Sequence, residues 1–152
     1  MTEALFYHLE RRSLEEVLPG LVERTLERGW RALIRAESAE RAEAVDNLLW
    51  TYDDSSFLPH AQAGDGDGAR QKVLITVEAD NPNKADVLFL VGGADNDWGA
   101  VSGFVRVVTM FDGRDADMLG KARLAWKAAR SAGLDATYWK ETPSGRFEKQ
   151  GA

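Results

Sequence analysis

ALFYHL, residues 4–9, is short, apolar and aromatic, and it predicts a buried first strand. A helical pattern follows and begins at Ser13 with Glu16 three residues on, which is the capping-box signature of a helix start. RALIR, residues 31–35, predicts a second strand, and residues 38–50 predict a second amphipathic helix. Such alternation of strands and helices is typical of a parallel sheet with helices packed on its faces.

The first helical pattern is interrupted by Pro19-Gly20, and Gly29 is expected to end it. Because proline removes a backbone donor, we expect the helix to kink or to restart at this dipeptide.

The pattern continues to residue 152 without an internal repeat or a dividing linker. Further strands are expected at residues 73–77, 87–91, 105–110 and 136–140. A third helix is expected at residues 115–132. Residues 64–68 predict a surface loop, and the tail beyond Glu141 is expected to be loose. The sequence therefore predicts one domain over residues 1–152, a three-layer α/β/α fold with a mostly parallel, twisted, Rossmann-like sheet.

Composition narrows the class of protein. Of the 152 residues, 44% are hydrophobic and 29% are charged, which excludes a disordered chain. Cysteine is absent, so disulfides, thiolate metal sites and cysteine nucleophiles are excluded, and a cytoplasmic location is expected. No apolar run approaches the roughly 20 residues that a membrane span needs, and no signal peptide is expected.

Charge is distributed unevenly along the chain. Residues 1–118 carry 12 Lys and Arg against 22 Asp and Glu, whereas residues 119–152 carry 7 against 3. The net charge of −6 disfavours a protein whose whole surface clamps DNA. The basic excess near the C-terminus instead predicts an anionic partner of limited size.

Catalytic patterns are weak in this sequence. The segment Asp53–His60 contains aspartate, serine and histidine side chains. The alternative hypothesis for the function is therefore a small hydrolase or a nucleotide-binding enzyme that uses this segment. The chain has no G-x-S-x-G elbow and no Lys-Ser/Thr after the glycines of residues 64–68. Asp95 and Asp97 are better explained by a turn than by a metal site. We expect no catalytic residue, no metal and no cofactor.

The predicted helix over residues 115–132 carries the most distinctive pattern. At about 100° per residue, Arg123, Lys127 and Arg130 share one stripe, Trp126 borders the stripe, and Lys121 lies off to one side. No acidic residue lies between Asp117 and Asp135, so the cations lack i,i+4 partners. An ordinary solvated face is the alternative. The combination of cations and an indole predicts binding of a short acidic peptide with a hydrophobic end.

A second cluster combines aromatic and aliphatic residues near the end of the helix predicted over residues 38–50. It contains Leu48, Leu49, Trp50, Tyr52, Phe57, Leu58 and Pro59. Such a cluster is either core beneath a loop or a hot spot for another subunit.

An ordered set of segments runs from about Leu5 to Trp139. The set comprises Phe6-Tyr7, Leu49-Trp50, Ser56-Phe57-Leu58-Pro59-His60, Asn81-Pro82-Asn83, residues 87–91, Met110-Phe111-Asp112-Gly113, Ala122-Arg123 and Trp126-Lys127. No single segment is sufficient, but together they resemble the chi subunit family of bacterial DNA polymerase III.

The resemblance implies a three-layer α/β/α fold and a non-catalytic accessory subunit of the clamp-loader assembly in DNA replication. Members of this family bind the acidic, phenylalanine-ended C-terminal tail of single-stranded DNA-binding protein. They also bind the psi subunit, which connects them to the clamp loader. DNA would then be contacted only indirectly, and no membrane would be involved. The family is classed with the polymerase activity of the holoenzyme, yet this sequence lacks the clustered carboxylates that nucleotide transfer requires.

Residues carry over from the family by position. The tail-binding residues that carry over are Arg123 and Lys127, with Trp126 as the aromatic residue beside them. Arg130 and Lys121, from the same predicted helix, complete the expected tail-binding set. The set facing psi, or another replication or repair protein, is Trp50, Phe57, Leu58 and Pro59. Leu119 departs from the family pattern because a further lysine is expected there. Direct DNA binding through residues 119–152 is a third alternative.

Overall fold

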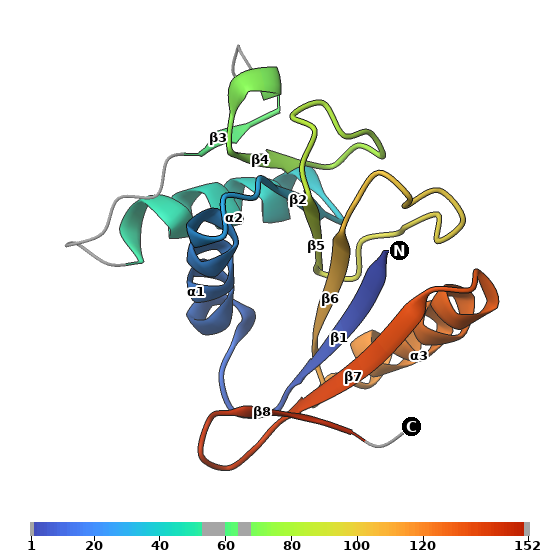
Figure 1. Ribbon diagram of the computed structural model, residues 1–152. Helices are drawn as coiled ribbons and strands as arrows, with labels where there is room; N and C mark the ends of the chain where they lie inside the picture. Colours follow the sequence, from blue (N-terminus) through green and yellow to red (C-terminus); the bar gives the residue numbers. More distant parts are fainter. Residues whose placement is uncertain (1, 53–59, 64–67, 151–152) are drawn as a thin grey trace.

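An eight-stranded sheet runs through the molecule in the order β3-β4-β2-β5-β6-β1-β7-β8 (Figure 1). The computed structural model describes residues 2–52, 60–63 and 68–150. Within them, neighbouring strands are parallel except β7 and β8, which are antiparallel. The elements are β1 Glu3–Leu9, α1 Leu14–Glu27, β2 Ala32–Ala36, α2 Ala39–Thr51, β3 Ala61–Gln62, the 3-10 turn η1 Gly68–Arg70, β4 Val73–Thr76, β5 Val87–Val91, β6 Arg106–Asp112, α3 Ala116–Ser131, β7 Asp135–Glu141 and β8 Phe147–Lys149.

Helices cover both faces of the sheet. α1 and α2 pack on one face, and α3 packs on the other against β6, β1 and β7 (Figure 1). Side chains of β5 alternate between the two cores, since Phe89 faces α1 and α2 whereas Leu88 and Leu90 face α3. Burial on both faces explains why the whole of β5 is apolar. The predicted α/β domain with a mostly parallel sheet is confirmed.

The expected start of α1 is confirmed in atomic detail. The Ser13 hydroxyl accepts a hydrogen bond from the Glu16 N–H, and the Glu16 carboxylate accepts one from the Ser13 N–H. Of the two outcomes expected at Pro19-Gly20, a kink or a restart, the restart does not occur, because α1 runs as one helix from Leu14 to Glu27. Pro19 is buried there beside Leu18. Burial of these side chains offsets the backbone bond that proline removes.

Two short strands were not predicted. β3 contains two residues and β8 contains three, so neither is long enough to show a periodic pattern. Residues 142–150, which the sequence suggests are loose, turn back after Glu141, and β8 pairs with β7 in the register Glu141↔Phe147. The C-terminal segment therefore adds an edge strand to the sheet.

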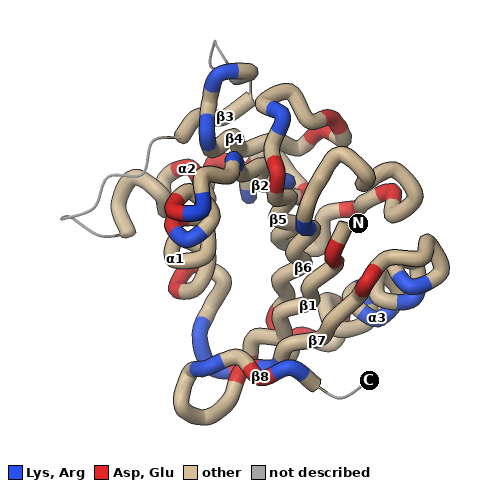
Figure 2. Tube along the Cα trace, viewed as in Figure 1, with Lys and Arg blue, Asp and Glu red and all other residues tan. Residues whose placement is uncertain are grey.

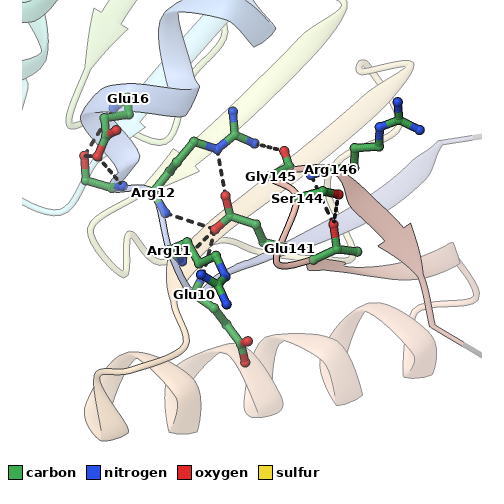
Figure 3. Close-up of polar contacts among 10 residues, drawn as sticks. Glu10, Arg11, Arg12, Glu16, Glu141, Ser144, Gly145 and Arg146 are labelled. Carbon is green, nitrogen blue, oxygen red and sulfur yellow. Dashed lines mark hydrogen bonds and ion pairs between the residues drawn. The ribbon is translucent and has the colours of Figure 1, made fainter.

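The Glu141 carboxylate joins the end of β7 to the turn between β1 and α1 (Figure 3). Its Oε1 accepts hydrogen bonds from the backbone N–H groups of Glu10, Arg11 and Arg12, at 3.1, 2.7 and 3.0 Å. Its Oε2 lies 2.7 Å from Nε of Arg12, and the Glu141 side chain is fully buried. Burial alone would raise the pKa of Glu141, but the Arg12 side chain and the three backbone donors lower it from 4.5 to about 2.

We expect Glu141→Gln to destabilise the protein by about 1–3 kcal/mol at neutral pH, because an amide cannot satisfy four donors as a carboxylate does. Since folding lowers this pKa, the charged carboxylate stabilises the native state above about pH 4.5 and loses that contribution as the pH falls toward 2. Urea denaturation from pH 7 to pH 2 measures both effects. Glu148→Gln, on exposed β8, is the control and should change stability by less than about 0.5 kcal/mol. A Glu141→Gln variant as stable as the wild type at pH 7 would contradict this account.

Candidate functional site

α3 begins at Asp115, whose side chain accepts hydrogen bonds from the backbone N–H groups of Asp117 and Met118. The small residues Ala122 and Ala129 are buried, so the helix axis lies close to the sheet. The Lys and Arg positions of α3, which include the predicted stripe and Lys121, are blue along the helix in Figure 2. The stripe residues Arg123, Lys127 and Arg130 are all exposed.

Trp126 is half-buried at the edge of α3 that faces β7. Its ring meets Phe6 edge-on with centroids 5.3 Å apart, and meets Tyr138 edge-on at 5.9 Å. The Arg130 guanidinium carbon lies 5.7 Å from the centroid of the indole. The indole is therefore fixed by the core on one side and carries a cation on the other.

A hollow of about 500 Å³ lies beside this indole. The apolar part of its wall is formed by Trp126, Leu134 and Tyr138. Positive charge comes from Arg130 and Lys149. Lys149 belongs to β8 and was missed by sequence analysis, because a three-residue edge strand gives no periodic signal. Asp135 also lines the hollow and opposes anions on its side.

Tyr138 is held in place by His8 of β1, since the Tyr138 hydroxyl and Nδ1 of His8 are hydrogen-bonded. Burial lowers the pKa of His8, with Glu10 acting in the opposite direction. The imidazole is therefore neutral near pH 7, and Nδ1 accepts the proton that the phenol donates. Burial raises the pKa of Tyr138, and the nearby charge of Arg123 opposes that rise. Arg123 does not itself line the hollow.

Lys121 lies on the other edge of α3. A Cβ at Gly93 would come within 3.3 Å of the Lys121 Nζ, so this lysine packs over the segment that follows β5. It lines a separate hollow of about 430 Å³, together with Leu124, whose exposed fraction is 69%. The structure therefore places Arg130 beside Trp126 at the hollow. Arg123 and Lys127 are exposed on the same helix outside the lining of that hollow, and Lys121 lies on its other edge.

The second predicted cluster is only partly described. Trp50 lies in the last turn of α2 with 52% of its surface exposed, and its ring centroid lies 4.5 Å from that of His60. Phe57, Leu58 and Pro59 lie outside the described residues, as do the aspartates and serines of residues 53–56. The His60 side chain is fully buried, with Nε2 3.1 Å from a carboxylate oxygen of Asp46.

Comparison with known proteins shows the family of this chain. Residues 1–137 match the family model described as DNA polymerase III chi subunit, HolC. The chain belongs to this family. It is also 28% identical over 95 residues to a protein named probable DNA polymerase III subunit chi from Rickettsia prowazekii (strain Madrid E). That alignment covers 62% of this chain and 58% of the relative, so the chain spans less than two thirds of that protein.

Chi subunits are non-catalytic accessory subunits in DNA replication, so the hydrolase alternative is wrong. Within residues 2–52, 60–63 and 68–150, no group of three His, Cys, Asp or Glu side chains could hold a metal ion. In the same described residues, no helix is both long and apolar enough to cross a bilayer.

Gly113 makes room for the His8 ring that orients Tyr138. A Cβ at Gly113 would lie 1.7 Å from Nε2 of His8, and that ring is packed against Phe111 at 5.1 Å between centroids. We expect Gly113→Ala to displace the imidazole and to lower stability by about 1–3 kcal/mol. Thermal unfolding and the near-ultraviolet circular dichroism of the aromatic cluster measure the change.

Gly120→Ala on α3 is the matched control for Gly113→Ala. Nothing lies within 4 Å of a Cβ at Gly120, so alanine there should stabilise the helix by up to about 1 kcal/mol. If both variants changed stability in the same direction, the steric role of Gly113 would be refuted.

Proposed function

We propose that this chain is a binding adaptor that captures the acidic, phenylalanine-ended C-terminal tail of single-stranded DNA-binding protein on α3. In this role it links that protein to the clamp loader through psi. The observation that carries the proposal is the hollow beside Trp126, which combines apolar wall with positive charge. Among the described residues, Arg123, Lys127 and Arg130 form no ion pair, so they are available to an anionic partner.

The chemistry of such a tail suits the two parts of the site. Guanidinium groups bind carboxylates through paired hydrogen bonds, and Lys127 adds a point charge. The phenyl ring of the terminal residue would pack against the indole of Trp126 and the ring of Tyr138. Asp135 repels carboxylates on its side of the hollow, so the acidic residues of the tail belong along the exposed stripe.

The strength of this binding follows from the exposure of the cations. Exposed ion pairs contribute about 0–1 kcal/mol each, so much of the affinity must come from the aromatic contact. Affinity in the micromolar range is expected, and it should fall as salt screens the stripe. Weak, exchangeable capture suits an adaptor that must also release its partner.

We expect Arg123→Ala combined with Lys127→Ala to weaken tail binding by roughly three- to thirtyfold, because two exposed ion pairs are lost. Isothermal titration with an acidic peptide that ends in phenylalanine measures the affinity. The same peptide ending in alanine should bind at least about tenfold more weakly, since its ring no longer fills the hollow.

The charge-matched control is Arg24→Ala combined with Arg28→Ala on α1, which should leave peptide affinity unchanged. Unchanged affinity after loss of Arg123 and Lys127 would remove the proposed mechanism.

The partner surface at the end of α2 is proposed separately, since Trp50 is an exposed aromatic of the kind found in interface hot spots. We expect Trp50→Ala to abolish co-purification with co-expressed psi while peptide binding by α3 is retained. Leu124→Ala removes an even more exposed apolar side chain elsewhere and should leave psi binding intact. Retention of psi by the Trp50 variant would reject this surface.

A further inference from the structure

A groove runs between α1 and the strands β6, β1, β7 and β8, on the face of the sheet opposite α3. It consists of two hollows, of about 150 and about 400 Å³, which share Tyr7, Leu21 and Arg24. Tyr7 belongs to the core beneath α1 and α2, whereas Trp126 belongs to the core beneath α3. The groove is therefore separated from the proposed tail site by the thickness of the sheet.

Three arginines from two elements meet in the smaller hollow. Arg24 comes from α1, Arg28 caps its C-terminal end, and Arg106 comes from β6. The guanidinium carbons of Arg28 and Arg106 lie 5.2 and 5.3 Å from the ring centroid of Trp30. Both guanidinium groups therefore lie close to one indole ring.

Tyr7 lines the same hollow as these cations. Burial raises the pKa of Tyr7, while the charges of Arg106, Arg24 and Arg28 all oppose that rise. Among the described residues, the Tyr7 hydroxyl makes no hydrogen bond, and Arg24 and Arg28 have no acidic partner. Arg106 forms an ion pair with Glu3, whose Oε2 lies 3.1 Å from Nε of Arg106. The smaller hollow therefore concentrates donors and positive charge, and among the described residues only Arg106 of its three arginines has an acidic partner.

The larger hollow extends this site over aromatic rings. Tyr7 stacks on Trp139 with centroids 6.4 Å apart and meets Phe147 edge-on at 4.8 Å. Arg12 and Arg146 line its far end; Arg12 is neutralised by Glu141, and Arg146 forms no ion pair among the described residues. Glu16, on the α1 side, is the acidic group that lines this hollow.

We propose that this groove binds a short segment of single-stranded nucleic acid, with one phosphate in the smaller hollow and the adjoining nucleotide over the aromatic rings. Guanidinium forks match phosphate oxygens bidentately, and the Tyr7 hydroxyl supplies a further donor. Aromatic side chains next to a cationic groove are the combination on which successive bases stack. An acidic peptide would use the cations but has no flat ring at each residue for the aromatic hollow, so the strand is the better fit.

Binding of a fluorescently labelled thymidine oligonucleotide of about eight residues, measured by anisotropy at low salt, tests the proposal. Arg24→Ala combined with Arg28→Ala should weaken binding at least about tenfold. The slope of log affinity against log salt should fall by about 0.7, which corresponds to one phosphate contact. Tyr7→Phe retains the ring and removes only the hydroxyl, so it should weaken binding by roughly three- to fivefold without changing thermal stability.

Arg123→Ala combined with Lys127→Ala removes the same charge from the other face and should leave oligonucleotide affinity within about twofold. An equal loss in that variant would place DNA binding on residues 119–152 and overturn the groove. No measurable binding, or equally strong binding of thymidine monophosphate, would also overturn it. The groove would also be overturned if an acidic peptide displaced the labelled oligonucleotide as effectively as unlabelled oligonucleotide does. The double variant Arg24→Ala and Arg28→Ala should still bind the acidic peptide with unchanged affinity. Titration of this variant with the peptide therefore tests the tail site on α3 separately from the groove.

Discussion

The fold depends on one buried carboxylate, that of Glu141, which binds three consecutive backbone N–H groups in the turn between β1 and α1. This turn decides the direction in which α1 leaves the sheet, and the same contact fixes the end of β7. Because β7 also carries Tyr138 and Trp139, the position of this strand determines the geometry on both faces of the sheet. A neutral side chain could fill the same space but could not hold four donors at once.

The register between β1 and β7 places the two proposed sites back to back. Phe6 pairs with Tyr138 and supports the hollow beside α3, whereas Tyr7 pairs with Trp139 and forms part of the groove beside α1. Since successive strand residues point to opposite faces, a shift of one residue would exchange these side chains between the faces. Two neighbouring residue pairs on β1 and β7 thus contribute to the two proposed sites on opposite faces of the sheet.

Local patterns in the sequence predicted the elements whose periodicity is long and clear, such as β5 and α3, and the turn of 100° per residue predicted the stripe of Arg123, Lys127 and Arg130. The sequence left open whether α1 kinks or restarts at Pro19, because core packing, which overrides local propensity, decides that the helix continues. Lys149 was missed because β8 exists only through its pairing with β7. The meeting of Tyr7, Arg24 and Arg106 depends on strand order, which no local pattern contains.

The net charge of −6 bears on how either site could work. An acidic body repels acidic tails and nucleic acid at long range, and at physiological salt this repulsion is screened beyond about 8 Å. Anionic partners would therefore be attracted only within a short distance of cations without an ion pair, which in the described part of the chain include those on α3, those near the end of α1 and Arg146. Binding under these conditions is local and reversible. For an accessory replication subunit, such contacts allow partners to exchange without dissociation of a large interface.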